Sequence, residues 1–510
     1  MERFLTRHAG RITGMLSGFD RIVFRGTLRS ISFLAVMDKF LSSQHVLYKD
    51  FASFAARVTA RVRAHAEALA QQTGRPLEYL SSSAISKERR ARDIANRDGI
   101  TEGLICIFSC VEPCWSTTVR PDRATKRLRL VSGERRCVHL YFYVLDPEIG
   151  LLHVRVQTWL PLAIQVWVNG RYWLAQQLRA AGVPYTQVDN AFTHIGDLAQ
   201  AQALSDQCVA WPWQRRLDQL AAWVNPWLSG EGALFRGYYW SVRESEYATD
   251  VLFQSATELP TLYPRLVHHA LETFGPADIL RFLGRAVPGR FVGEARTTLV
   301  HRPEGCRVRH WIDENSLKMY DKGPTLLRLE FTLNNPARFK VYRRRPSDGQ
   351  YDWLPLRRGI ADFRRQAILG RAATLRYLDA LSVVGDPTPS HRLLDPISQR
   401  ITRNGRPYRA LRPISPEEAP LLQILLRGEF LADSFTNRDL RRCLEHVTVA
   451  DAGRERQQAA RMTRQLRLLR AHGLIKKVPR THRYRITRKG TTVLTTAIRF
   501  RETDIALLAA

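Results

Sequence analysis

Two stretches of this chain, far apart in the sequence, share the order of several strands and then one long helix. The first has the apolar patterns typical of strands at residues 104–108, 127–131, 138–145 and 151–158, and a helix is expected from about Pro161 to Gly182. In the second, strands are expected between Phe291 and Asn334 and a helix over about Pro355–Leu381. Strands that lead into a covering helix are typical of an α+β layer. The repeated order suggests a duplicated α+β unit, although no residue-level self-similarity supports it.

The net charge limits what the protein binds. The 510 residues include 78 Lys and Arg against 48 Asp and Glu, a net charge of +30, and 68 of these cations are Arg. Arg forms paired hydrogen bonds to phosphate and stacks on bases, so a nucleic acid is the expected partner. A hydrophobic fraction of 45% excludes a mostly disordered chain. No apolar stretch approaches the roughly 18 residues of a membrane span, and Cys is sparse, so we expect a soluble, cytoplasmic protein.

The last part of the chain has the strongest motif. Helices are expected at Glu417–Arg427, Asn437–Leu444 and Arg454–His472. The following residues, GLIKKVPRTHRYRITRKG, alternate like two short strands around a basic turn, and a last helix is expected from Thr491. Residues 400–510 hold 24 Lys and Arg against 10 Asp and Glu, a net charge of +14. This part therefore combines a compact helical pattern with a high positive charge.

This order resembles the winged helix-turn-helix domains of bacterial regulators, including those called MarR-like. The resemblance implies that the third helix enters a major groove, while the hairpin, or wing, contacts the backbone or minor groove. Met462, Leu466 and Leu469 define the buried face of that helix. The side chains expected to reach base edges are Gln457, Arg461, Arg464, Gln465 and Arg467. The expected phosphate contacts of the wing are Lys476, Lys477, Arg480, His482, Arg483 and Arg485. The alternative is that the domain docks a protein.

These features predict an α+β multidomain protein whose β-rich and helical body, duplicated if the two stretches are related, carries a C-terminal winged helix-turn-helix. The expected parts are an N-terminal strand and helical region (1–100), a first α+β unit (101–185), a mainly helical region (186–285), a second α+β unit (286–384), a Pro-rich linker (385–416) and the winged helix-turn-helix (417–500). Six Pro residues in the linker argue against regular structure there.

The most specific segment of the body is a pair of expected strands, KMYDKG (318–323) and LRLE (327–330). Alternation places Lys318, Tyr320 and Lys322 on one face of the first strand, and Glu330 lies on the second. A phenol can attack a phosphodiester while nearby cations bind the phosphate and a carboxylate binds a metal ion. The predicted catalytic residues are therefore Tyr320, Lys322 and Glu330, with Mg²⁺ as the cofactor if the protein is catalytic.

The same segment resembles the "YDKG…LRxE" element of the trans-acting replication initiators of rolling-circle plasmids and some phages. The resemblance covers residues 305–335 and implies that a metal-assisted tyrosine nicks one DNA strand. In that family the nucleophilic tyrosine precedes an element that matches Gly305-Cys306-Arg307, and Leu299–Glu304 contains no Tyr here. The alternative is a polar cross-strand cluster on a half-solvated sheet. The whole chain also resembles a widespread bacterial protein family, a likeness that fixes no chemistry.

Three further groups have both a structural and a functional interpretation. The strand-like run 19–26, FDRIVFRG, fits either a salt-bridged outer face or a phosphate grip by Arg21 and Arg25. Two runs rich in aromatic residues and Arg, 167–173 and 236–243, fit either core packing or platforms on which unpaired bases stack. His153, near Asp146, fits a core residue better than a base or ligand.

The cysteines allow one more alternative. Cys106, Cys110 and Cys114 lie four residues apart, with Cys137 and His139 further along the chain. Zinc ligands usually occur as pairs two residues apart, so buried free thiols are favoured and zinc is the alternative.

The expected function is therefore that of a nucleic-acid-binding protein of a mobile-element or replication type. It would recognise a DNA site, or a structured RNA site, and if it is an enzyme it would be a metal-dependent endonuclease or strand transferase. One alternative is a non-catalytic winged-helix transcriptional regulator, and another is a structured-RNA-binding protein of a ribonucleoprotein. DNA is favoured over RNA, and no membrane partner is expected.

Overall fold

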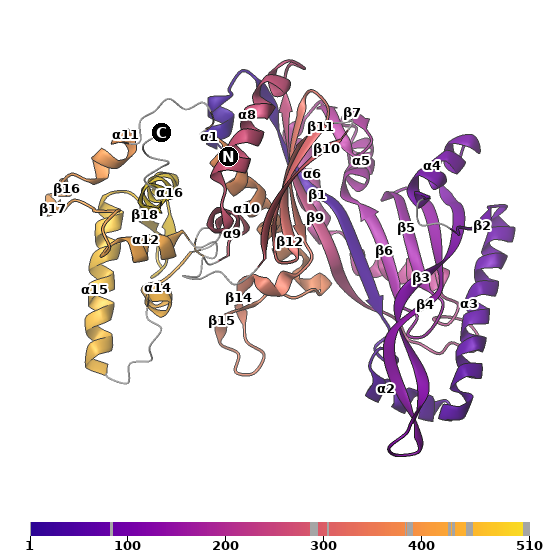
Figure 1. Ribbon diagram of the computed structural model, residues 1–510. Helices are drawn as coiled ribbons and strands as arrows, with labels where there is room; N and C mark the ends of the chain where they lie inside the picture. The colour runs from indigo at the N-terminus through magenta and orange to yellow at the C-terminus, as the bar shows by residue number, and fades with distance from the viewer. Residues whose placement is uncertain are drawn as a thin grey trace.

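The computed structural model describes residues 2–81, 85–285, 294–302, 305–382, 384, 391–426, 430, 434–444 and 452–502. One large sheet forms its centre (Figure 1). Its strands are β1 (Ile12–Thr27), β2 (Leu77–Tyr79), β3 (Gly103–Asp122), β4 (Arg127–Asp146), β5 (Gly150–Gln157), β6 (Ile164–Asn169), β9 (Tyr239–Phe253), β10 (Ala295–Arg302), β11 (Gly305–Ile312), β12 (Asn315–Asp321) and β13 (Leu326–Leu333). Their order is β10-β11-β12-β13-β9-β1-β6-β5-β4-β3-β2, and all pairs are antiparallel except β2 with β3.

The two halves of this sheet have the same topology. Strand β1 is followed by helices and then by the antiparallel series β3-β4-β5-β6, which returns to pair with β1. Strand β9 is likewise followed by helices and then by β10-β11-β12-β13, which returns to pair with β9. Strands β1 and β9 pair in antiparallel orientation, so the two halves join edge to edge in one continuous sheet. The repeated topology agrees with the expected duplication of an α+β unit.

The expected boundaries at residues 100 and 185 cut through this sheet. Strand β1 lies in the predicted N-terminal region 1–100, and β9 lies in the predicted mainly helical region 186–285, yet both are central strands. The prediction failed because the partners of β1 are far away in the sequence, as the pairs Arg21 with Asn169 and Arg21 with Glu246 show. No local pattern reveals such pairing.

Helices cover the sheet and close its cores. They are α1 (Glu2–Arg7), α2 (Leu34–Ser43), α3 (Phe51–Thr73), α4 (Lys87–Arg97), α5 (Gly170–Ala180), α6 (Leu198–Gln207), α7 (Trp213–Val224), α8 (Glu258–Thr273), α9 (Pro276–Leu283) and α10 (Phe363–Leu381). Phe19 and Phe24 of β1 pack against Phe363 at the start of α10, with ring centroids 4.5 and 5.9 Å apart. Helices α8, α9 and α10 pack with the apolar side chains of β9 to β13 in a second core. None of the described helices is long and apolar enough to cross a membrane.

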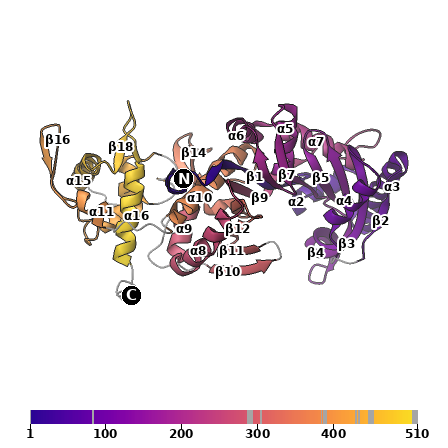
Figure 2. The ribbon, with the colours of Figure 1, turned by 90° about the horizontal axis from the view of Figure 1, so that it is seen from above.

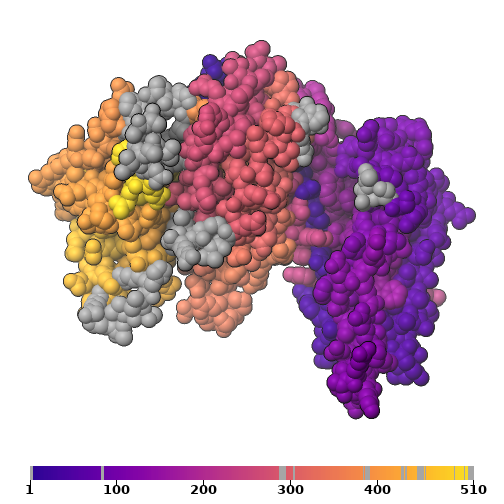
Figure 3. Space-filling model, in the orientation of Figure 1, coloured from indigo at the N-terminus to yellow at the C-terminus, as the bar shows by residue number. Residues whose placement is uncertain are grey.

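Two small hairpins and one long one extend this body. The small hairpins are β7 (Tyr185–Val188) with β8 (Ala191–Ile195) and β14 (Lys340–Arg344) with β15 (Tyr351–Pro355). The long β3–β4 hairpin projects away from the other strands (Figure 1). The space-filling view is hollowed between this hairpin and the second half of the sheet (Figure 3).

The C-terminal part lies at the opposite end of the molecule from α3 (Figures 1 and 2). Its elements are α11 (His391–Leu394), β16 (Ile401–Arg403), β17 (Arg406–Tyr408), α12 (Ala419–Leu425), α14 (Asn437–Leu444), α15 (Ala452–Ala471), β18 (Ile475–Lys477), β19 (Tyr484–Ile486) and α16 (Arg488–Glu502). Met462, Leu466 and Leu469 of α15 are buried in its core, as expected. Strands β18 and β19 pair as the two short strands expected around the basic turn.

The prediction that residues 385–416 lack regular structure was wrong for the described part, 391–416. A hairpin of β16 and β17 lies there, with Asn404 at φ 51° and Gly405 at φ 72° in its turn. An Asn-Gly pair with positive φ at both positions is typical of a two-residue hairpin turn. The density of Pro obscured this signal. Helix α11 also falls in the predicted linker.

Candidate functional site

The polar face at the centre of the sheet is shaped by two β-bulges between β1 and β9. In β1, Phe19 pairs with Tyr247 and Arg21 pairs with Glu246, so Asp20 is an extra residue. At a classic bulge the extra residue and the one after it point to the same side of the sheet. The bulge therefore brings the carboxylate of Asp20 to the polar face while Phe19 stays in the core.

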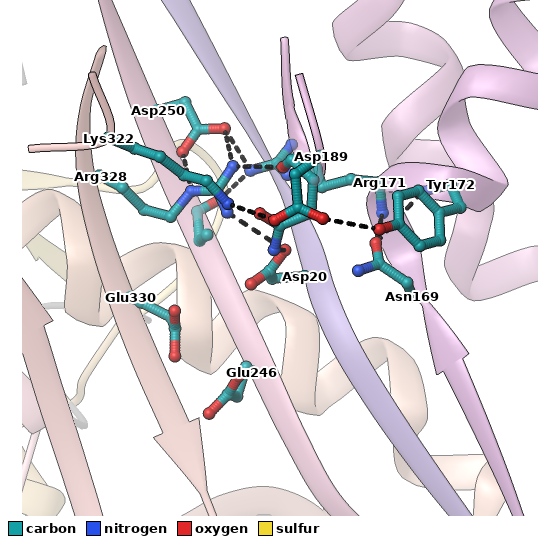
Figure 4. A network of polar contacts seen from close by, with 12 residues as sticks. Asp20, Asn169, Arg171, Tyr172, Asp189, Glu246, Asp250, Lys322, Arg328 and Glu330 are labelled. Carbon is teal, nitrogen blue, oxygen red and sulfur yellow. Dashed lines mark hydrogen bonds and ion pairs between the residues drawn. The ribbon is translucent and has the colours of Figure 1, made fainter. Parts of the chain in front are cut away.

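Three carboxylates meet on this face, each from a different neighbouring strand. They belong to Asp20 of β1, Glu246 of β9 and Glu330 of β13, all buried, and each offers an oxygen within 4.8 Å of the others. Figure 4 shows these side chains on their three strands. Neither Asp20 nor Glu246 was recognised from the sequence. The available signal was the pair of adjacent charges, Asp20 and Arg21, inside a strand-like run.

Lys318 and Tyr320 of β12 contact this group of carboxylates. The Lys318 ammonium donates to Glu246 Oε1 at 2.7 Å and also to Glu330. The Tyr320 hydroxyl donates to Glu330 Oε2 at 2.8 Å. Lys318 and Glu330 are direct cross-strand partners, as are Tyr320 and Arg328. The predicted pairing of Tyr320 with Glu330 is thus present, with Lys318 rather than Lys322 beside the carboxylate.

The ionisation of the group follows from its burial and its charges. Burial and the neighbouring Glu330 raise the pKa of Glu246 to about 7. Burial also favours the neutral form of Glu330, but the Lys318 ammonium and the Tyr320 hydrogen bond outweigh it and lower its pKa to about 2. Burial raises the pKa of Asp20. Burial and the Glu330 carboxylate hold the pKa of Tyr320 well above its usual value, so the phenol keeps its proton.

A buried ion-pair network supports the site from one side. The Arg328 guanidinium, fully buried, donates to Asp250 Oδ1 at 2.6 Å and to Asp20 Oδ1 at 3.3 Å. Arg171, at the start of α5, lies 3.1 Å from the other Asp250 oxygen. Asn190 donates to Asp20 Oδ1 at 2.8 Å. Figure 4 shows Arg328 between the two aspartates, an arrangement that fixes the position of the Asp20 carboxylate.

A cavity of about 270 Å³ gives access to Tyr320 and Glu330. Its lining includes three cations, Arg307, Lys318 and Lys322, and three carboxylates, those of Glu330, Asp189 and Asp321. Lys322 donates to Asp189 at the cavity's edge, at 3.2 Å. The lining therefore mixes both signs of charge around the phenol.

The three carboxylates suit a hard divalent cation. Mg²⁺ and Mn²⁺ prefer carboxylate oxygens and are usually held by one or two carboxylates together with substrate phosphate. The position between Glu246 and Glu330 is bridged here by the Lys318 ammonium, which shows that this position favours positive charge. Asp20, Glu246 and Glu330 are therefore the residues that could hold the ion.

Arg21 and Arg25 differ in their environments. Arg21 donates to Glu246 Oε1 at 2.8 Å and to Glu244, as expected of a salt-bridged outer face and not of a phosphate grip. Arg25 is exposed, and its positively charged neighbours are Arg243 and Arg358. The phosphate contact predicted for both residues therefore stays a prediction for Arg25, while Arg21 is engaged by glutamates.

Most predicted nucleic-acid contacts of the C-terminal part are exposed. The exposed side chains are Gln457, Arg461, Arg464, Arg467, Lys476, Lys477, Arg480, His482 and Arg485, and Gln465 is half-buried. Arg483 is committed to the fold, because it donates to Ser434 Oγ at 2.5 Å and lies 5.2 Å from the Tyr342 ring centre. A groove of about 790 Å³ is lined by Arg403, Arg406, Arg467, Arg470, Lys476 and Lys477, and no Asp or Glu is among its lining residues.

The cysteines that were expected to be buried free thiols fall into two groups in the structure. Cys106 and Cys110 are buried thiols near α4, as expected. Cys114, Cys137 and His139 converge instead, with 2.9 Å between the two sulfurs and a ligand atom from each of the three within 4.8 Å of the others. Because Cys114 and Cys137 lie on opposite strands of the β3–β4 hairpin, their spacing in the sequence hides this cluster.

The remaining candidates are mostly structural. His153 stacks on Trp167 with ring centroids 5.6 Å apart, and burial lowers its pKa to about 3, as in a core histidine. Asp146 accepts backbone hydrogen bonds at the turn that follows β4. In the two aromatic runs, Trp173 and Trp240 are buried, whereas Tyr239 is 45% exposed.

No family model, curated protein or solved structure matches this chain.

Proposed function

We propose that this protein binds nucleic acid and cleaves one strand by metal-assisted attack of Tyr320. The observation that carries the proposal is the meeting of Asp20, Glu246 and Glu330 beside the Tyr320 hydroxyl, which lines a cavity together with Arg307, Lys318 and Lys322 and with carboxylates. A nucleophile, a proton acceptor and a set of hard oxygen ligands within hydrogen-bond reach are the parts required for this chemistry.

Each residue of the site would have its own role in strand cleavage. The Tyr320 oxygen attacks the phosphorus atom, its proton passes through the hydrogen bond to Glu330 and on to water, and the bond from phosphorus to the leaving sugar oxygen breaks. The leaving oxygen takes a proton from water, so the products are a phosphotyrosyl link and a free hydroxyl end. Arg307, which forms no ion pair with a carboxylate of the described residues, would balance the charge of the phosphate. A divalent ion held by the three carboxylates would supply Lewis acidity toward the phosphate oxygens.

The C-terminal part would hold the nucleic acid. We infer that its helices and hairpin form a winged helix whose α15 reads a duplex site, as the exposure of Arg461, Arg464 and Arg467 supports. The groove that lacks carboxylates, next to β18, supplies further phosphate contacts. DNA is the preferred substrate, and the class of protein would be a mobile-element or replication nickase of the cytoplasm.

The experiment is a cleavage assay with the full chain. Supercoiled plasmid and single-stranded oligonucleotides are incubated with Mg²⁺ or Mn²⁺, and covalent protein–nucleic acid adducts are separated on denaturing gels. We expect an adduct that Tyr320→Phe and Glu330→Gln abolish and that chelation prevents. Tyr351→Phe, an exposed hydroxyl deletion on the β14–β15 hairpin, is the matched control.

A second candidate function, the non-catalytic regulator, is favoured by the contacts of Lys318 and Arg21, which already neutralise the carboxylates. It would be supported if the wild-type chain bound duplex DNA tightly but gave neither nicks nor adducts with any divalent ion.

A further inference from the structure

Four exposed arginines and one tyrosine gather where β1 ends and β9 begins. They are Arg25, Arg29, Tyr239, Arg243 and Arg358, and we call this group the arginine surface. We propose that the arginine surface binds an unpaired nucleic-acid strand and leads it to the cavity of Tyr320. The inference deepens the proposed function, on which it rests for the role of the strand as substrate.

The second β-bulge builds this surface. Val23 pairs with Glu244 and Phe24 pairs with Val242, so Arg243 is the extra residue on β9. Its side chain is therefore turned to the same side as Glu244, which is the face of Arg21. The adjacent charges in the sequence RESE thus mark a bulge, as Asp20 and Arg21 do on β1.

The backbone fixes Arg358 beside these strands. Gly359 forms an isolated bridge with Ser241, and Val242 N–H donates to the Arg358 carbonyl at 2.7 Å. Arg358 in turn donates to the Arg243 carbonyl at 2.9 Å. Ser241 is the register partner of Arg25. Three cationic side chains from β1, β9 and the segment after β15 are therefore held together by main-chain contacts.

Among the described residues, the acid whose charge acts on this group is Glu314, which opposes the lowering of the Arg358 pKa by burial and by Arg243. Within the described ranges, no carboxylate forms an ion pair with Arg25, Arg29, Arg243 or Arg358. The pKa of Arg25 is lowered mainly by burial and then by the charges of Arg243, Arg358 and Arg155, so several cations lie near it. A polyanion that lies across the surface would pair with these cations and release its own counterions.

The exposed ring of Tyr239 indicates that the bound nucleic-acid strand is unpaired. The ring is 45% exposed, and the Arg29 guanidinium lies 3.9 Å from its centre. An exposed aromatic ring beside cations forms a stacking platform for a base that is free of a partner, whereas duplex bases are already stacked. The other aromatic side chains of this run, Tyr238 and Trp240, are buried and serve the core.

The arginine surface lies on the same sheet face as the cleavage site. Arg25 follows Arg21 by four residues of β1, a separation of about 13 Å along a strand. Arg21 itself contacts Glu246 of the carboxylate group. A strand bound to Arg25 and Arg243 can therefore reach the Tyr320 cavity within a few nucleotides.

The test measures binding of the full chain to fluorescent oligothymidylate and oligouridylate, and to a duplex, in chelator at several salt concentrations. The double variant Arg243→Gln/Arg358→Gln should bind oligothymidylate at least about tenfold more weakly. Its salt slope should fall by about 1.4, because each phosphate contact on a single strand contributes about 0.7. Tyr239→Ala should weaken binding about fivefold or more, and Tyr239→Phe should restore it. The matched control is Arg57→Gln/Arg63→Gln on α3, where both side chains are exposed.

Binding in chelator separates this inference from the cleavage chemistry. Wild-type protein that binds the strands but never cleaves them would refute the proposed function and leave the surface supported. An unchanged affinity and salt slope in Arg243→Gln/Arg358→Gln, or wild-type binding to duplex alone, would overturn the arginine surface. A preference for oligouridylate over oligothymidylate would identify RNA as the source of the strand.

Discussion

The Tyr320 hydroxyl donates a 2.8 Å hydrogen bond to Oε2 of Glu330, a residue of the neighbouring strand. The same carboxylate offers an oxygen to the group formed with Asp20 and Glu246. Glu330 therefore joins the candidate nucleophile to the candidate metal ligands. A single substitution at this position is expected to affect both functions, whereas a change at Tyr320 should affect only the attack.

Metal binding should depend on pH through Glu246. Its pKa is raised to about 7 by burial and by Glu330, so below that pH the carboxyl holds a proton that a metal ion must displace. We expect the affinity for Mn²⁺ to rise up to about tenfold per pH unit between about pH 5.5 and 7 and to level off above. Isothermal titration calorimetry at several pH values measures this rise, and Glu246→Gln should remove most of it.

The same pKa shift has the opposite sign for stability. An unfolded chain ionises Glu246 near the ordinary value of 4.5, while the folded metal-free protein ionises it near 7. The folded state thus binds more protons between these values, and the metal-free protein should lose stability as the pH rises from about 4.5 to 7. Glu246→Gln should reduce that loss in urea titrations, and an unchanged pH profile would contradict the assignment.

Arg328→Met should destabilise the body strongly. The change keeps much of the side-chain volume but leaves Asp250 and Asp20 buried without their main cation, at a cost of about 3–5 kcal/mol. Every Trp lies at or before position 353, so Trp fluorescence in urea follows the body alone. Arg338→Met is the control, because its side chain is 50% exposed and its ion pair with Asp313 spans 3.8 Å. A loss below about 1 kcal/mol, as for a surface pair, would contradict the role assigned to Arg328.

Within the C-terminal part, substitutions should separate sequence-specific base contacts from sequence-independent phosphate contacts. Arg464 is exposed on the face of α15 away from Met462, so Arg464→Ala should cost about 1–3 kcal/mol on the preferred site and relax the sequence preference. Lys477→Ala, in β18, should weaken binding to all sequences alike and reduce the duplex salt slope by about one. Binding to specific and scrambled duplexes at two salt concentrations checks both. A folded Arg464→Ala variant with unchanged preference would favour protein docking instead.

Met462→Ala should act on stability and not on contacts to nucleic acid. Met462 is 5% exposed in the C-terminal core, and its truncation should cost about 2–5 kcal/mol. Because the C-terminal part contains no Trp, the helical circular dichroism signal should melt earlier while Trp fluorescence of the body keeps its midpoint. Coincident loss of both signals would show that the two parts unfold together.

The sequence was sufficient wherever a pattern was local. The 3.6-residue spacing of Met462, Leu466 and Leu469 placed α15 within two residues at its ends. The alternation in 318–322 put Lys318, Tyr320 and Lys322 on one face of a strand, which is β12 in the structure. These features depend on neighbours in the chain, so they can be read without knowing the fold.

The tertiary structure alone decided which distant residues meet. Asp20 and Glu246 are separated by more than two hundred residues and become neighbours only because β1 and β9 pair at the centre of the sheet. The bulges at Asp20 and Arg243 then select the face to which each side chain turns, since one extra residue reverses the alternation of the residues that follow. Long-range pairing and register leave no local periodicity. The sequence could name Arg25 and the run 236–243 as candidates, but only the tertiary structure could show that they meet and that the three carboxylates form one group.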